Sequence, residues 1–260
     1  MRYLKKFFIV SIVLLTIAVM VFSLWLPGRY VVPIIMYHQV TYTEHPQTNW
    51  VSPENFEWQM AYLKEHNYDV IPLGELVEAV EEGRSLPRKT AVITFDDGYE
   101  NNYTQAFKVL KEYGFPATIF VPSDKVGTKG RLTWEQIKEM IASGIDIGSH
   151  TRIELYLPDA FVEVQRQEIE MSKNILEQNL GITVDHFAYP IGGFSEEIKE
   201  IVKRAGYKSA CATNRGYDRF NKDVFELNRI RFSDKDNRKD YLWMKLSGYY
   251  NLFRKAKNPY

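Results

Sequence analysis

Cysteine is nearly absent from this chain, with Cys211 as the single example among 260 residues. One cysteine excludes an internal disulfide and a metal site built from several thiolates. An excess of one charge is also missing, because Lys and Arg together number 33 and so do Asp and Glu. Without a basic excess the composition gives no signal for nucleic-acid binding, and a neutral or mixed partner is expected.

Internal repeats and Gly/Ser-rich linkers are missing as well, so nothing in the sequence divides it into several folded units. The 20 residues from Phe7 to Leu26 include no charged side chain. They follow three basic residues, Arg2, Lys5 and Lys6. An uncharged run of that length can span a bilayer, and its basic flank is expected to remain in the cytoplasm. No Ala-x-Ala type cleavage site follows the run, which favours an uncleaved signal anchor over a cleaved signal peptide.

These features predict two parts. Residues 1–29 are expected to form a basic cytoplasmic flank and a transmembrane signal anchor over 7–26. Residues 30–260 are expected to form one folded domain at the cell membrane, on its extracellular or periplasmic side.

After residue 30, short apolar and β-branched runs alternate with segments of helical periodicity. This alternation predicts an α/β fold with a mostly parallel sheet, and at this length a β/α barrel fits better than two small domains. Local signals place a loop over 41–51, a helix starting at Ser52-Pro53, a helix over 100–113, a capping box from Thr133 to Gln136, a helix over 160–179 closing at Gly181, a strand over 227–232 and a last helix over 237–256.

The most informative stretch is Thr90 to Tyr99, where an apolar strand ends in Asp96, Asp97 and a glycine. The carboxyl ends of strands are where α/β folds usually place their chemistry. Two adjacent carboxylates are costly unless a cation or a shared proton relieves them, and a metal is the obvious cation. The alternatives for an isolated Asp-Asp-Gly are a loop of solvated acids or a helix N-terminus that favours negative charge.

Three other predicted strands also end in residues that could contribute to a site. They deliver His38, His150 and the pair Tyr189-Pro190. A histidine in such a place can act as an acid or base because its pKa lies near neutrality, although a single histidine is more often structural. In a barrel these strand ends converge on one face, which makes them a candidate site.

The motifs themselves resemble those of the polysaccharide deacetylases, carbohydrate esterase family 4. The first is Thr94-Phe95-Asp96-Asp97-Gly98-Tyr99, the second is Ser149-His150-Thr151, and the third is Phe187-Ala188-Tyr189-Pro190-Ile191-Gly192-Gly193. Segments 33–40 and 227–232 are also similar to the branch that includes secreted poly-N-acetylglucosamine deacetylases. The resemblance spans about residues 31–233 and implies a distorted (β/α)7 barrel.

The resemblance also implies roles for individual residues. Asp96 matches the general base that activates water, whereas Asp97 and His150 match metal ligands. The backbone N–H of Ile191 matches a position that helps to hold the oxyanion, although the usual aromatic side chain is absent. His38 lies where this branch carries its catalytic acid.

One position departs from the family pattern. The second metal histidine is replaced by Glu154. A carboxylate is a legitimate zinc ligand, so Asp97, His150 and Glu154 together could hold a metal with open positions for water. The resemblance implies zinc, and the oxygen-rich set also suits cobalt, manganese or iron. The opposing interpretation is that Glu154 faces solvent and the site is weak or inactive.

Three functions follow from this sequence. The first is a membrane-anchored, metal-dependent N-deacetylase of an extracellular amino-sugar polysaccharide, with poly-N-acetylglucosamine, peptidoglycan and chitin fragments all open as substrates. The second is a catalytically silent glycan-binding or assembly protein on the same barrel, which the substitution at Glu154 favours. The third is a two-carboxylate glycoside hydrolase, which the adjacency of Asp96 and Asp97 disfavours because such acids stand on opposite sides of a bond.

Overall fold

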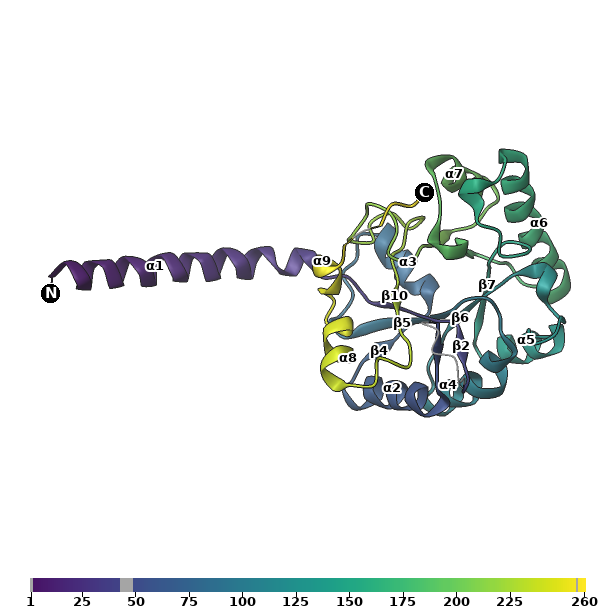
Figure 1. Cartoon of the computed structure of the whole chain (residues 1–260), viewed down its shortest axis with the longest axis horizontal. Coiled ribbons are helices and arrows are strands. Elements are labelled where there is room, and N and C mark those ends of the chain that lie inside the picture. The colour runs from purple at the N-terminus through teal and green to yellow at the C-terminus, as the bar shows by residue number, and fades with distance from the viewer. Residues whose placement is uncertain (1, 43–48, 256) are drawn as a thin grey trace.

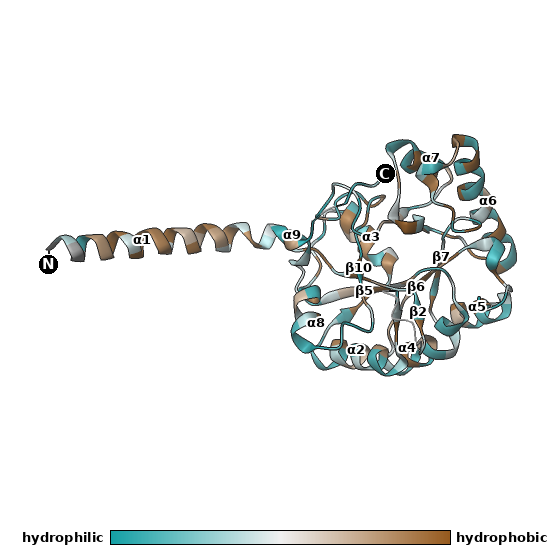
Figure 2. Cartoon of the chain, in the orientation of Figure 1, coloured by the Kyte–Doolittle hydropathy of each residue, from teal (hydrophilic) through white to brown (hydrophobic). Residues whose placement is uncertain are grey.

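The chain is described here by a computed structural model that covers residues 2–42, 49–255 and 257–260. It begins with one long helix, α1 (Arg2–Trp25), which leaves the folded domain as an isolated rod (Figure 1). Within it, Lys6–Trp25 has a mean hydropathy of 2.9, and none of this segment is buried. Figure 2 shows the resulting band of hydrophobic residues along the rod. By length and composition this helix can cross a membrane.

The folded domain is built on a curled parallel sheet. Seven strands follow one another in the order β10-β1-β5-β6-β7-β8-β9, and β4 pairs with β5 outside that path. The strands are β1 (Ile34–Tyr37), β4 (Asp69–Val70), β5 (Thr90–Phe95), β6 (Thr118–Val121), β7 (Asp146–Ser149), β8 (His186–Ala188), β9 (Ser209–Cys211) and β10 (Ile230–Arg231). A separate parallel pair is formed by β2 (Gln39–Val40) and β3 (Trp50–Val51). The expected distorted β/α barrel is therefore confirmed.

Helices cover the outer face of this sheet, as Figure 1 shows. The outer helices are α2 (Pro53–Glu65), α4 (Lys108–Tyr113), α5 (Trp134–Ala142), α6 (Val162–Leu180) and α7 (Glu196–Arg204). The helix α3 (Leu73–Glu81) instead packs on the inner side of the curled sheet, and α8 (Lys239–Leu246) and α9 (Tyr250–Phe253) lie beside the end of α1. The predicted caps are present, because the side chains of Ser52 and Thr133 accept hydrogen bonds from backbone N–H groups in the first turns of α2 and α5. Gly181 ends α6 in the left-handed conformation, as expected.

Alternation along β5 separates two cores. Ala91, Ile93 and Phe95 pack toward the outer helices, whereas Val92 packs inside the curled sheet with residues of the other strands and of α3. Because side chains alternate across a strand, Asp96 points to the same inner side as Val92. The fold thus directs Asp96 into the barrel, while Asp97 follows with a left-handed φ of 71° and faces His150.

Four expectations differ from the observed elements. The predicted loop over 41–51 includes Trp50 and Val51, which form β3, while its residues 43–48 lie outside the described part. The helix over 100–113 is present, but it is π-helical at Asn102–Phe107. The strand over 227–232 is regular only at Ile230–Arg231.

The last helix, expected over 237–256, is split into α8 and α9 at Gly248. This glycine has a φ of 78°, and a Cβ atom there would lie 2.1 Å from the Tyr30 ring. The backbone of Val31 also donates a hydrogen bond to the Gly248 carbonyl at 2.8 Å. Close packing against the start of the domain therefore requires glycine here and interrupts the helix.

Candidate active site

Asp96 is held deep in the barrel by an arginine that sequence reasoning did not single out. The two nitrogens Nη1 and Nη2 of Arg229 donate to the two carboxylate oxygens of Asp96 at 2.6 and 2.7 Å. Arg229 is fully buried, and its remaining bonds go to the Ala212 carbonyl and the Thr94 hydroxyl. Burial by itself would raise the pKa of Asp96, but the charge and hydrogen bonds of Arg229 lower it, so the carboxylate stays ionised.

Asp97 and His150 face each other at the carboxyl ends of β5 and β7. Oδ1 of Asp97 lies 3.3 Å from Nε2 of His150, and both side chains are largely buried. On its other side His150 donates from Nδ1 to the Ala188 carbonyl at 2.8 Å, so Nε2 is the nitrogen that faces Asp97 and that would bind a metal after losing its proton. Burial alone would raise the pKa of Asp97, but the hydrogen bond and charge of His150 lower it to about 2.

Glu154 lies next to this pair without joining it. Its carboxylate is bound by Arg131 Nη1 at 2.5 Å and by Lys125 Nζ at 3.2 Å. The same Arg131 nitrogen also donates to the backbone carbonyl of Asp97. Two basic side chains therefore already bind the carboxylate that is predicted as the third metal ligand. Among the described residues, no three His, Cys, Asp or Glu side chains are arranged to hold a metal ion.

His38 follows β1 and enters the site from the side of Asp96. Its Nδ1 atom is buried and has no hydrogen-bond partner among the described atoms. Burial lowers the pKa of His38, and the charges of Asp96 and Asp97 only partly oppose this shift. The side chain of Asn102, from the π-helical segment, donates to the His38 carbonyl at 2.7 Å and fixes the strand end. Single π-helical turns are frequent at functional sites, and this one positions a candidate acid.

Ile191 lies in a tight turn, Pro190–Gly192, after β8. Its φ of 58° is left-handed, and its side chain is exposed to solvent. Gly192 follows with a φ of 77°, and a Cβ atom there would fall 2.4 Å from the Thr213 hydroxyl. The turn is thus held close to the neighbouring strand end, and it places backbone N–H groups at the same edge of the sheet as His150.

Comparison with known proteins agrees with this geometry. Residues 83–210 match the model of the polysaccharide deacetylase family. A Bacillus subtilis protein named as a polysaccharide deacetylase, YxkH, is 33% identical over 201 residues, which cover 77% of this chain and 71% of the relative.

This chain belongs to the polysaccharide deacetylase family.

Other relatives of the deacetylase have narrower names. A Staphylococcus aureus poly-beta-1,6-N-acetyl-D-glucosamine N-deacetylase is 27% identical over 199 residues, covering 71% of this chain and 68% of that protein. The solved structure of the Streptococcus pyogenes deacetylase PplD in complex with acetate has a TM-score of 0.74 and 29% identity, covering 79% of this chain and 95% of that one. The protein is therefore an enzyme of the polysaccharide deacetylase type, a class that is generally metal-dependent.

The buried ion pair of the deacetylase predicts a large loss of stability when it is broken. Replacing Arg229 with methionine leaves Asp96 buried without its partner, which should lower the free energy of unfolding by about 3–5 kcal/mol. The measurement is denaturant unfolding of the full chain. Arg84 pairs with Glu82 at an exposed position, so Arg84→Met is the matched control and should change stability by no more than about 0.5 kcal/mol. Equal losses in both variants would contradict the assignment.

Proposed function

We propose that this deacetylase is membrane-anchored and metal-dependent, and that it removes acetyl groups from amino-sugar residues of an extracellular polysaccharide. The observation that carries the proposal is the meeting of Asp96, Asp97, His150 and His38 at the carboxyl ends of three strands of the barrel. The relative named for poly-beta-1,6-N-acetyl-D-glucosamine supports a polymer of that type, and peptidoglycan is the other candidate.

Part of the site fits a divalent metal. Asp97 and His150 present an oxygen and a nitrogen to the same point, and the carbonyl behind His150 fixes its ring in the way that metal-bound histidines require. Glu154 lies close by but is neutralised by Arg131 and Lys125. We propose that Asp97 and His150 hold the metal and that Glu154 joins them when the bound cation repels those two side chains. Zinc is the first candidate, with cobalt, manganese or iron as alternatives.

When bound, such a metal lowers the pKa of water and polarises an amide carbonyl. Asp96 accepts the proton of the attacking water, and its ionised state under the influence of Arg229 keeps it ready to do so. The Ile191 N–H donates to the oxygen of the acetyl group as negative charge develops on it. His38 protonates the leaving nitrogen, because its imidazole follows β1 at the same edge of the sheet and lies within the field of Asp96 and Asp97. The products are acetate and a free amine.

Acetate release tests this function directly. The full chain is incubated with a chitooligosaccharide and, in separate reactions, with zinc, cobalt, manganese or iron. The proposal expects release above that of an Asp96→Asn variant with at least one of these metals. Release equal to that of the variant with all four metals would favour the second function, a silent glycan-binding or assembly protein, which the pairing of Glu154 with two cations supports.

The departure at Glu154 gives a prediction about metal affinity. Replacing Glu154 with histidine exchanges a carboxylate that is paired with Arg131 for a nitrogen ligand that zinc prefers, so zinc affinity should rise by about tenfold. Competition with a chromophoric chelator measures the dissociation constant without reference to activity. Glu154→Gln is the matched control, because it also frees Arg131 but adds no imidazole. An equal rise in both variants would mean that lost charge pairing, rather than a new ligand, causes the change.

The anchor is part of the proposal as well. We propose that residues 1–29 comprise a cytoplasmic flank and an uncleaved anchor over 7–26, and that residues 30–260 form the catalytic domain outside the cytoplasm. The apolar, unburied helix at Lys6–Trp25 supports this division. Sequencing the N-terminus of the membrane-bound protein should recover the start of the chain. A mature N-terminus near residue 28 would instead identify a cleaved signal peptide.

A further inference from the structure

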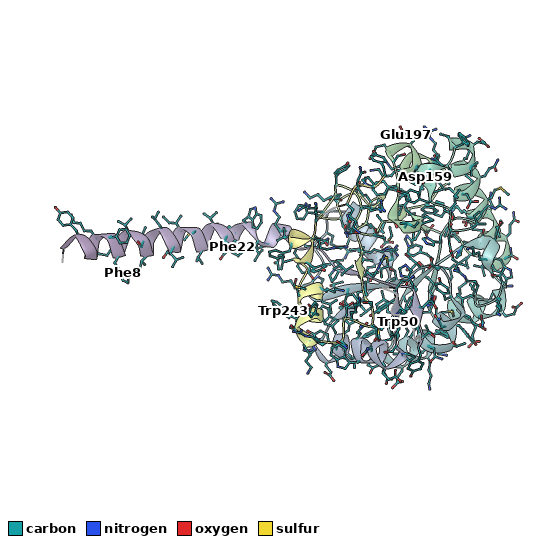
Figure 3. The ribbon with its side chains drawn as sticks, viewed as in Figure 1. Phe8, Phe22, Trp50, Asp159, Glu197 and Trp243 are labelled. Carbon is teal, nitrogen blue, oxygen red and sulfur yellow. The ribbon has the colours of Figure 1, made fainter. Side chains whose placement is uncertain are left out.

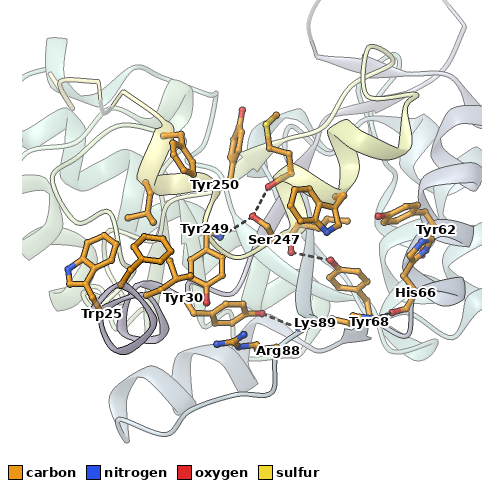
Figure 4. A pocket seen from close by; sticks show the side chains of 17 residues that line it. Trp25, Tyr30, Tyr62, His66, Tyr68, Arg88, Lys89, Ser247, Tyr249 and Tyr250 are labelled. Carbon is orange, nitrogen blue, oxygen red and sulfur yellow. Dashed lines mark hydrogen bonds between the residues drawn. The ribbon is translucent and has the colours of Figure 1, made fainter. Parts of the chain in front are cut away.

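A large apolar groove lies where α1 meets the domain. Its volume is about 940 Å³, and it is lined by the end of α1, by α8 and α9, and by residues before β1, β4 and β5 (Figure 4). Aromatic and aliphatic side chains make up most of the lining. The Arg and Lys side chains among the described lining residues are Arg88 and Lys89, and no acidic residue is among them. The groove is therefore apolar inside, with positive charge at its border.

Large hydrophobic side chains around the groove are exposed to solvent. Phe253 is 84% exposed and Trp243 is 67% exposed, and Trp25 at the end of α1 is half exposed. Figure 3 shows Trp243 on the side of the domain from which α1 leaves. Exposed aromatic residues of this kind next to an apolar hollow indicate a binding surface rather than an ordinary protein exterior. Trp and other aromatic side chains are enriched where proteins meet the headgroup layer of a membrane.

The junction between α1 and the groove is fixed by contacts. The Arg29 guanidinium lies over the Trp25 ring at 5.0 Å and over the Phe220 ring at 4.9 Å. The Tyr30 hydroxyl accepts a hydrogen bond from the Lys89 backbone at 3.2 Å, and the Tyr30 ring packs edge-on against Tyr249 at 5.8 Å. These contacts place the groove directly beside the end of the proposed anchor. If α1 spans the bilayer, the groove lies at the membrane surface.

We propose that this groove docks on the outer surface of the membrane and holds an anionic phospholipid. The acyl chain enters the aromatic groove, while Arg88 and Lys89 bind the phosphate of the headgroup. Tyr249 lines the groove, and its buried hydroxyl has no hydrogen-bond partner among the described atoms. Basic residues at the lipid surface attract anionic headgroups, and apolar side chains beside them add burial. This inference rests on the proposed membrane anchoring.

Docking in this way would orient the catalytic site. Lys89 immediately precedes β5 and Asp96 immediately follows it, so the border of the groove and the site lie at opposite ends of one strand. A strand of six residues is roughly 20 Å long, at 3.3 Å per residue. The docked domain would therefore present its catalytic face away from the lipid and toward a polymer outside the membrane.

A single cysteine label can test the docking in the full chain. Cys211 is fully buried, and burial raises the pKa of its thiol to about 12, so it should not react with a label in the folded protein. Phe253→Cys carries an environment-sensitive fluorophore at the groove. Phe161→Cys is the matched control, because Phe161 is 87% exposed and lies at the start of α6, away from the groove. Both proteins are reconstituted in vesicles of phosphatidylcholine and phosphatidylglycerol in equal amounts.

The expected result is that acrylamide quenches the label at position 253 about threefold less than the label at position 161. Vesicles of phosphatidylcholine alone, or the double change Arg88→Gln and Lys89→Gln, should remove most of this protection. The double change Lys203→Gln and Arg204→Gln on α7 is the control for loss of two positive charges, and it should leave protection intact.

Flotation of the same vesicles separates this inference from the anchor. A protein that floats with the vesicles but shows equal quenching at both positions would overturn the docking and leave the anchor standing. A protein that does not float would overturn the anchor and the docking with it. Protection that is the same with and without phosphatidylglycerol would overturn the binding of an anionic headgroup.

Discussion

Replacing Asp96 with asparagine should reduce acetate release by about a thousandfold, because the amide cannot accept the proton of the attacking water. The side chain keeps nearly the same shape, so the substrate should still bind. The measurement is the rate of acetate release from a chitooligosaccharide at saturating metal and substrate. A loss that appears only in KM would assign Asp96 to substrate binding instead of proton transfer.

Two controls make this result specific. Asp124 is exposed and pairs with Arg152 near the same edge of the barrel, so Asp124→Asn removes a nearby charge without touching Arg229. It should leave the rate within about twofold of the wild type. The thermal transition of Asp96→Asn must also be followed, because a buried Arg229 without its anion destabilises the fold. An Asp96→Asn variant that is folded but inactive would support the role of Asp96 as a base.

Replacing Asp97 or His150 with alanine should abolish stable metal binding and activity together. Each change removes one of the two ligands that face each other at 3.3 Å, and a divalent ion held by so few protein groups depends on both. Elemental analysis of the purified full chain after dialysis against the metal gives the bound content directly. Unchanged metal content in both variants would show that the ligands are elsewhere.

A second aspartate–histidine pair provides the matched control. Oδ2 of Asp146 lies 3.7 Å from Nε2 of His186. Both residues begin their strands, β7 and β8, so the pair lies at the end of the sheet opposite to the proposed site. Residues at the amino ends of barrel strands usually serve stability. Asp146→Ala should therefore leave the metal content unchanged. Metal loss in this variant as well would indicate unfolding rather than removal of a ligand.

The sequence by itself determined which residues reach the edge of the sheet where the carboxyl ends of the strands meet. A buried strand is recognised by a local run of apolar, β-branched residues, and its carboxyl end follows directly from its last residue. For this reason Asp96, Asp97, His38 and His150 could be predicted at one edge of a parallel sheet. Helix ends could be predicted for the same reason, since each depends on a few neighbouring residues. Examples are the N-caps at Ser52 and Thr133 and the end of α6 at Gly181.

Contacts between distant segments could not be predicted in the same way. Arg229 is 133 residues from Asp96 along the chain, and nothing in its own neighbourhood marks it as the partner of a buried carboxylate. The predicted strand over 227–232 would have been the one signal, since an arginine inside an apolar strand of a barrel must find an anion. The break of the last helix likewise depends on the Tyr30 ring packing against Gly248.

Only the tertiary structure decided how the charges at the site are paired. The resemblance to the family placed Glu154 at the position of the second metal histidine, but its carboxylate is bound by Arg131 and Lys125 from another part of the chain. The groove beside α1 arises in the same way, because its walls come from both ends of the chain and from residues 62–89. Periodicity reports on neighbours in sequence, whereas ion pairing, burial and cavities depend on which segments the folded sheet brings together in space.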